Sequence, residues 1–432
     1  MTLSSSILWQ NDRKTVVLLD LVRSIEEAQI PSGQLAANNG KPPATLRRLI
    51  SALPPATPFP TPEPKAGGSE LPATSPSAQI AELMTQGAAE SALEEIKASH
   101  DGPWCLPRIT SSKQEPEESA QDPSSNSNAP SPPPSSSPPP PQPQPALSST
   151  DPLHYHFPPD SHPLLGTIPV TSNTTDTSVS ANPGMMTPIP IPTDLRFDLI
   201  VLDPPWPNRS AKRKRKRAGA YRPIADLASV RTLLRHAPVA SRLAPGGLVA
   251  VWVTNAARFA DLLLGSGNGR GSGSGNRRGG RGGGRQGGGG GNRGGVFAEW
   301  DVELVGEWTW LKVTAGGEPV VPVDSAWRKP WERLLIGRKR GPATAAAGDG
   351  KVRIGAVEGK VIVAVPDVHS RKPNLRGLFE ELLPERYEAL EVFARNLTAG
   401  WWAWGDQVLL FQRRGYWVEE SGSDDEVNTT CS

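Results

Sequence analysis

The chain has 432 residues, and its 47 prolines and 43 glycines are too many for a protein that folds throughout its length. A formal net charge of only +2 excludes attraction of nucleic acid by the protein as a whole and leaves recognition to local basic patches. Two distant cysteines, Cys105 and Cys431, and the absence of any apolar run near ~20 residues argue against a disulfide framework, a metal site and a membrane span, so we expect a soluble intracellular protein.

The first 30 residues predict a short element of strands and a helix. Residues 6–9 and 15–20 are apolar runs around the turn at 11–13, and a helix is predicted to begin near Ser24. We expect this element to pack against the rest of the protein and to carry no chemistry of its own.

Residues 31–193 are rich in proline, serine and threonine, with nine prolines between Ser131 and Pro145. Such a segment buries too little apolar surface to offset its ordering entropy, so we expect it to be disordered. Residues 77–100 carry apolar residues at helical spacing and predict one isolated amphipathic helix. A helix of this kind is typical of a tethered segment that binds a protein partner.

The sequence from Leu199 to Leu202 is wholly apolar and runs directly into Asp203, Pro204, Pro205 and Trp206. This pattern predicts a strand that is buried on both faces and ends abruptly, because proline lacks an N–H group and fixes φ. In open α/β sheets, ligands bind at the carboxyl ends of the strands.

These four residues suit chemistry on a planar amine. The Asp203 carboxylate and the Pro204 carbonyl could accept the two N–H bonds of an exocyclic adenine amine, which is otherwise a poor nucleophile. Trp206 offers an aromatic face for stacking, worth roughly 1–3 kcal/mol per base. The alternative is that Asp-Pro-Pro-Trp merely ends a strand, and the tetrapeptide alone does not decide between the two.

Two basic segments follow. Residues 212–217, beginning with Lys212 and Arg213, are six consecutive basic residues, a pattern typical of nuclear import signals that also suits phosphate contacts beside the predicted cleft. Residues 266–295 contain seventeen glycines and six arginines, which predicts a disordered insert that binds single-stranded nucleic acid weakly.

The remaining sequence alternates between predicted strands and helices, which indicates a doubly wound α/β domain over residues 194–416. The predicted helices are 226–243, 256–264 and 375–382, and the predicted strands are 248–253, 307–313, 331–337, 361–365, 389–396 and 407–411. Residues 417–432 form an acidic tail.

Five blocks then occur in a characteristic order. They are 203–206, 310–312, 329–337, 369–373 and 391–396, the last followed by Trp-rich sequence through Gln407. Their joint occurrence resembles the N6-adenine methyltransferases typified by the messenger-RNA adenosine methyltransferase, and within them the branch called methyltransferase-like protein four. The resemblance covers residues 194–416 without the glycine-rich insert.

The resemblance implies a Rossmann-like methyltransferase sheet with permuted motif order and S-adenosylmethionine as methyl donor. It assigns the catalytic role to residues 203–206 and places Lys372 on the donor's carboxylate. It places Arg395 and Asn396 on the ribose, Asp406 and Gln407 on the adenosine part, and Trp310, Lys312 and Glu332 in the target cleft. Simple packing is the alternative for Trp310, and the preferred interpretation for Trp401, Trp402 and Trp404.

The predicted function is therefore methylation of the adenine N6 amine in RNA, small nuclear RNA included, or in DNA. Methylation of another planar amine, cytosine N4 or a glutamine amide, is a second enzyme hypothesis. A catalytically silent RNA-binding subunit is the alternative from another class, and the intact residues 203–206 argue against it. The basic run favours a nuclear location, with a cytoplasmic pool also compatible, and the N-terminal region is the candidate contact for a protein partner.

Overall fold

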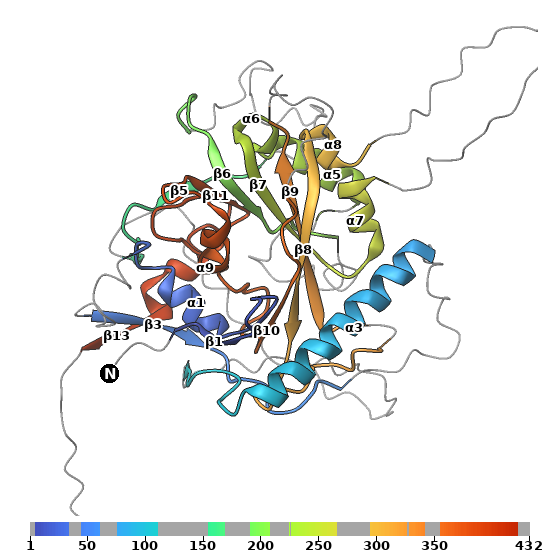
Figure 1. The fold of residues 1–432 in the computed structure, drawn as a ribbon. Coiled ribbons are helices and arrows are strands. Elements are labelled where there is room, and N and C mark those ends of the chain that lie inside the picture. The colour runs from blue at the N-terminus through green and yellow to red at the C-terminus, as the bar shows by residue number, and fades with distance from the viewer. Residues whose placement is uncertain are drawn as a thin grey trace, which may run out of the picture.

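The structure is a computed structural model that describes residues 5–33, 45–60, 76–110, 154–168, 191–207, 224, 226–265, 294–325, 328–341 and 355–421. Their central feature is a ten-stranded sheet, ordered β1-β2-β10-β8-β9-β7-β6-β11-β12-β5 (Figure 1). The strands are β1 (Ile7–Gln10), β2 (Val16–Leu19), β5 (His162–Leu165), β6 (Phe197–Leu202), β7 (Leu243–Val253), β8 (Val302–Lys312), β9 (Trp331–Lys339), β10 (Lys360–Ala364), β11 (Ala389–Val392) and β12 (Trp402–Gly405).

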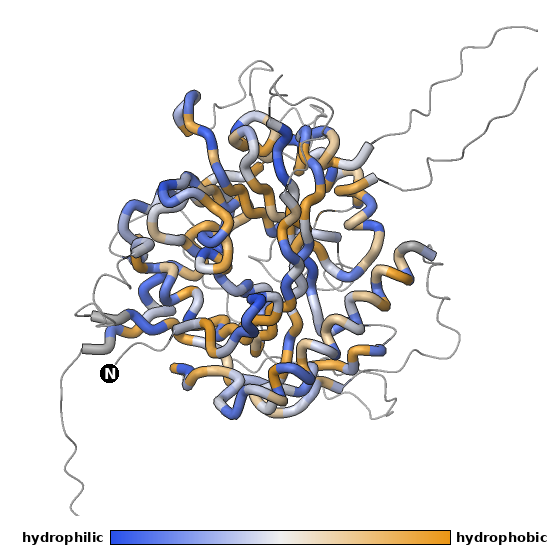
Figure 2. Tube along the Cα trace, viewed as in Figure 1, coloured by the Kyte–Doolittle hydropathy of each residue, from blue (hydrophilic) through white to orange (hydrophobic). Residues whose placement is uncertain are grey.

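The sheet is mostly parallel. Within it, β9 runs antiparallel to β7 and β8, and β1 runs antiparallel to β2, whereas the other neighbours are parallel. A parallel sheet is stable when both faces are covered, and β6 shows this, since Leu199 packs in one apolar cluster and Ile200 and Leu202 pack in another. Figure 2 shows β6 and β7 as strongly hydrophobic. This architecture confirms the predicted Rossmann-like α/β class.

Helices cover both faces. One face carries α5 (Leu227–His236), α6 (Val239–Arg242), α7 (Ala257–Leu264) and α8 (Val296–Glu299), and farther along the sheet α3 (Pro76–Ser99). The other face carries α1 (Leu21–Glu27), α9 (Arg376–Phe379) and the 3-10 turn η2 (Glu380–Leu382). No helix among the described residues has the length and apolar character needed to cross a membrane.

The N-terminal element forms as predicted and joins the main sheet. β1 and β2 pair around the expected turn, and β2 adds to β10 in parallel. The helix begins earlier than predicted, at Leu21, because the Asp20 side chain accepts a hydrogen bond of 2.7 Å from the Arg23 N–H and caps its start.

The prediction that residues 31–193 are disordered is wrong for three described segments. β5 extends the main sheet, while β3 (Thr45–Ser51) pairs with β4 (Ile109–Thr110) and with β13 (Trp417–Ser421) in a second sheet. Helix α3 is not isolated either, because Ala89, Leu93 and Ile96 are buried against β2, β8 and β10. Apart from residues 31–33 and 191–193, the rest of 31–193 lies outside the described residues.

Several boundaries also differ from the prediction. Residues 407–411 form no strand but a turn that leads into η3 (Leu410–Gln412), and the last strand of the main sheet is β12. The predicted helix 226–243 is divided at Pro238 into α5 and α6, because proline cannot continue the hydrogen-bonded ladder. The strand predicted over 389–396 ends at Val392, and β13 takes up the first five residues of the predicted tail. The limits 194–416 of the methyltransferase domain stay a prediction.

Candidate active site

The predicted site residues follow strands that end at one edge of the sheet. Asp203 follows β6, Lys312 ends β8 and Lys372 lies beyond β10. Since β9 runs the opposite way, Glu332 at its start lies at the same edge. The chain leaves β6 toward β7 on one side and has β11 on the other, so this edge is the switch point where open α/β sheets bind ligands.

The Asp-Pro-Pro-Trp segment is rigid. The Trp206 N–H donates to the Pro204 carbonyl at 2.8 Å, and its indole Nε1 donates to the Trp252 carbonyl, also at 2.8 Å. The Trp206 ring lies 4.7 Å from that of Phe259, with the planes 36° apart. Pro204 therefore keeps one of its two acceptor lone pairs for a substrate, and one face of Trp206 is already covered by Phe259.

Asp203 begins a row of four alternating charges. Its Oδ2 is 3.3 Å from Lys372 Nζ, which lies 3.0 Å from Glu332 Oε2, and Glu332 Oε1 accepts from Lys312 Nζ at 2.5 Å. The two ammonium groups also lie over aromatic rings, Lys372 at 5.7 Å from Trp252 and Lys312 at 4.5 Å from Trp310. The structure thus joins four residues to which the resemblance assigned three different roles.

The charges within the row shift the pKa values of Glu332 and Lys372. Burial alone would raise the pKa of Glu332, but the charges of Lys372 and Lys312 outweigh burial and lower that pKa to about 2. Burial would likewise lower the pKa of Lys372, and Asp203 and Glu332 reverse the effect and raise it. Both groups are therefore charged at neutral pH.

Glu391 is a further residue of the site, for which no role was predicted from the sequence. Alternation along β11 puts it on the face of Ala389, and its Cα pairs with that of Val201, two residues before Asp203. Burial, and then the charge of Asp203, raise the pKa of Glu391 to about 8. Glu391 is therefore mostly protonated at neutral pH. The available signal was a carboxyl inside the apolar run Ala-Leu-Glu-Val beside the Asp203 strand.

The residues predicted to bind the methyl donor lie at the same edge of the sheet. Arg395 and Asn396 follow β11, while Asp406 and Gln407 follow its parallel neighbour β12. Arg395 Nη1 donates to the Ser370 carbonyl at 3.3 Å and so joins this part to the segment that carries Lys372. These placements are compatible with one ligand that spans both groups.

Two predicted substrate residues are not placed by the structure, and one is placed in the core. Lys212 and Arg213 lie outside the described residues. Trp310 is only 3% exposed, so it offers almost no surface on which a base could stack. Its ring instead packs against the ammonium group of Lys312. Trp401 and Trp404 are buried, which confirms that they pack in the core.

No cluster of three histidine, cysteine, aspartate or glutamate side chains able to hold a metal ion occurs within the described ranges.

Comparison with known proteins identifies the family of this chain. Residues 197–262 and 288–407 match the family model described as MT-A70. The chain is 42% identical to the N6-methyladenosine RNA methyltransferase MTA1 of Cryphonectria parasitica over 414 residues, 96% of this chain and 94% of that protein. It is 41% identical to the protein of the same name in Pyricularia oryzae over 425 residues, 96% and 97% of the two chains. The human N(6)-adenine-specific methyltransferase METTL4 is 33% identical over 230 residues, 52% of this chain and 41% of that protein. The predicted family is confirmed: the chain belongs to the MT-A70 family.

Proposed function

We propose that this protein transfers a methyl group from S-adenosylmethionine to the N6 amine of adenine in nucleic acid. The observation that carries the proposal is the position of Asp203, fixed beside the Pro204 carbonyl at the switch point of the sheet and paired with Lys372 at 3.3 Å. RNA is the favoured substrate, because the two relatives above that match over 96% of this chain are named as RNA methyltransferases. A relative from Caenorhabditis elegans, 29% identical over 224 residues, is named as a DNA N6-methyl methyltransferase, so DNA belongs in the test.

The residues present fit the donor. Lys372 is a cation for its carboxylate, and Arg395, Asn396, Asp406 and Gln407 are polar groups for its adenosine. Bound S-adenosylmethionine supplies a methyl group on a positively charged sulfur, and Asp203 and Glu391 are acidic groups on the same face of the sheet. The Lys372 ammonium group thus complements the donor's carboxylate, and the Asp203 carboxylate complements its positively charged sulfur.

Asp203 and Pro204 act on the amine. The carboxylate and the carbonyl accept one N–H bond each, which turns the nitrogen lone pair out of conjugation with the ring and toward the methyl carbon. As the N–C bond forms and the C–S bond breaks, the nitrogen gains positive charge, and its surplus proton passes to the Asp203 carboxylate or through it to water. Lys372 holds the Asp203 carboxylate in place for this step, since its ammonium group is 3.3 Å from Asp203 Oδ2.

Asp203→Asn tests the assignment, because the amide keeps the shape and removes the charge. Methylation of matched RNA and DNA oligonucleotides is followed by mass spectrometry of the nucleosides, and S-adenosylmethionine binding by calorimetry. We expect turnover to fall at least about 100-fold while the dissociation constant of the donor changes by a small factor. Asp261→Asn, the same change on the exposed side of α7, is the matched control.

The outcomes separate the candidate functions. N6-methyladenine made by the wild-type protein and lost in Asp203→Asn supports the proposal. Wild-type-like turnover in Asp203→Asn would refute the mechanism. Another methylated amine as product would identify a different target, and binding of RNA without any turnover in the wild-type chain would favour the silent subunit.

A further inference from the structure

The segment that carries Lys372 is held by parts of the chain outside the family match. Residues 365–376 follow β10 and lead into α9. Their contacts come mainly from the N-terminal region, which precedes the matched residues 197–262 and 288–407. We call residues 365–376 the lysine loop.

The upstream half of the lysine loop is fixed at Asp367. The Ala52 N–H donates to Asp367 Oδ1 at 2.7 Å, and Arg371 Nη1 pairs with Oδ2. Arg108 Nη1 is 3.8 Å from Oδ1 and donates at 2.9 Å to the Pro366 carbonyl, while its Nη2 donates at 2.9 Å to the Val365 carbonyl. The three charged side chains are each at most 2% exposed. Ala52 and Arg108 thereby hold the backbone of the lysine loop at a place that is shielded from water.

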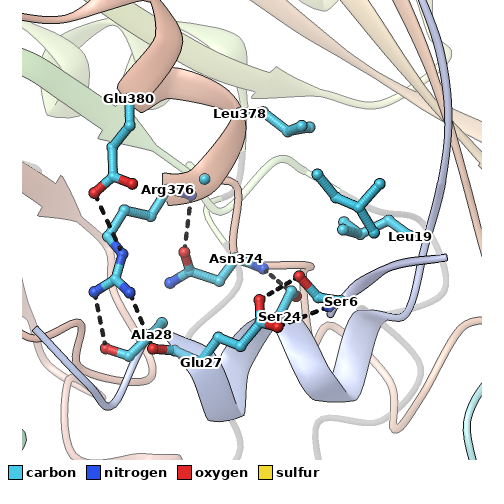
Figure 3. A pocket seen from close by; sticks show the side chains of 11 residues that line it. Ser6, Leu19, Ser24, Glu27, Ala28, Asn374, Arg376, Leu378 and Glu380 are labelled. Atoms are coloured by element: carbon cyan, nitrogen blue, oxygen red, sulfur yellow. Dashed lines mark hydrogen bonds and ion pairs between the residues drawn. The ribbon is translucent and has the colours of Figure 1, made fainter. Parts of the chain in front are cut away.

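The downstream half is fixed by helix α1 and the turn after it. The Asn374 N–H donates to Ser24 Oγ at 3.0 Å. Arg376 Nη1 donates to the Ile30 carbonyl at 2.8 Å and Nη2 to the Glu27 carbonyl at 2.9 Å. Figure 3 shows Asn374 in contact with Ser24, and Arg376 in contact with Glu27 and Ala28, among the residues that line one small cavity. Lys372 is thus bracketed on both sides by the N-terminal region.

This arrangement is a costly way to stabilise a fold. Burying one carboxylate between two guanidinium groups leaves a surplus positive charge, and buried ion pairs often contribute little net stability. Among the described residues, Arg371 Nε and Nη2 and Arg108 Nε have no hydrogen-bond partner. Ser370, just before Arg371, has φ 68°, a left-handed conformation that is strained for a residue other than glycine. The strained Ser370 and the unpaired groups of Arg371 lie within two residues of Lys372, where a defined position of the ammonium group matters.

We propose that Arg108 and Asp367 are positioning residues that place the Lys372 ammonium group for the carboxylate of the methyl donor. The N-terminal region is then part of the donor site rather than a separate docking element. This inference rests on the proposed function, because it takes Lys372 as the donor's carboxylate ligand.

The test compares two ligands in the full-length chain. S-adenosylhomocysteine has the carboxylate, whereas 5′-methylthioadenosine has the same adenosine part without it. We expect Arg108→Met to weaken S-adenosylhomocysteine about tenfold in calorimetry, since it misplaces one charge-assisted contact, and to change 5′-methylthioadenosine less than about twofold. In a Lys372→Ala background, Arg108→Met should have no further effect on either ligand.

Arg13→Met is the matched control, because Arg13 is also N-terminal but pairs with Glu358 on the surface. Asp367→Asn is the second variant, and circular dichroism checks that each variant is folded. If a folded Arg108→Met weakens the binding of both ligands equally, or changes the affinity of neither, the inference is overturned. If the wild-type chain binds neither ligand, the proposed function itself fails.

Discussion

The Glu391 carboxyl gives the protein a pH-dependent stability that can be worked out from its surroundings. Its pKa is about 8 in the folded chain and would be near 4.5 in the unfolded chain. Between these pH values the folded chain holds a proton that the unfolded chain has lost, so the free energy of unfolding falls as the pH rises from about 4.5 to about 8. The full difference corresponds to about 5 kcal/mol. Water reaches the half-buried side chain and screens part of this, so we expect about 2 kcal/mol.

Glu391→Gln removes the titration and keeps the shape. We expect the variant to be more stable than the wild-type protein by about 2 kcal/mol at pH 8.5, with the difference shrinking toward pH 4.5. Guanidinium unfolding followed by tryptophan fluorescence at a series of pH values measures this. Glu388→Gln, three residues earlier and exposed, is the control and should follow the wild type.

Identical pH dependence in the wild-type protein and Glu391→Gln would refute the reasoning. It would mean that Glu391 is ionised in the folded chain. A hydrogen-bond donor or solvent would then offset the rise in its pKa that burial beside Asp203 causes. A variant that is less stable than the wild type at pH 8.5 would have the same meaning.

Three further predictions concern the ligands. Lys372→Ala should raise the dissociation constant of S-adenosylmethionine about tenfold or more through loss of a charge-assisted hydrogen bond, and unchanged calorimetric affinity would mean that the donor site is misplaced. Replacing residues 212–217 by serine and glycine should lower turnover at saturating RNA, since the run is tied to the rigid turn at Trp206, and should also reduce nuclear accumulation of a fluorescent fusion. Deleting residues 266–295 should mainly raise the apparent KM and flatten its rise with salt, because a glycine tether only concentrates RNA near the site. Loss of turnover on that deletion, with turnover retained without the basic run, would reverse these two roles.

The core of the sheet and the gathering of the site could be predicted from the sequence because their signals are local. β6, β7 and β10 each contain a continuous apolar run, which parallel strands covered on both faces require. Once those strands are parallel, a residue just after one of them, such as Asp203, must lie at one edge of the sheet. The resemblance then supplied roles for residues at that edge.

Strands β3 and β5 could not be predicted because their partners are distant in the sequence. β3 contains Arg47 and Arg48 and reads as polar, yet it pairs with β13, more than 360 residues later. Arg48 is accommodated because Glu26 of α1 accepts from its Nε at 3.0 Å. β5 is only four residues long and is ordered by pairing with β12. Composition averaged over 31–193 hides such short segments, since their stability comes entirely from tertiary contacts.

The chemical state of the site was also beyond the sequence, because it depends on which charges the fold brings together. Glu332 and Glu391 are both carboxyls on strands at the same edge, but two lysines contact the first, whereas the nearest charge to the second is Asp203. Glu332, whose pKa is lowered to about 2, is therefore ionised at neutral pH and holds Lys372 in place. Glu391 changes charge near pH 8, within the range in which an enzyme works. A constant ion pair thus fixes the geometry around Asp203, and a titrating neighbour sets how much negative charge a cationic donor meets there.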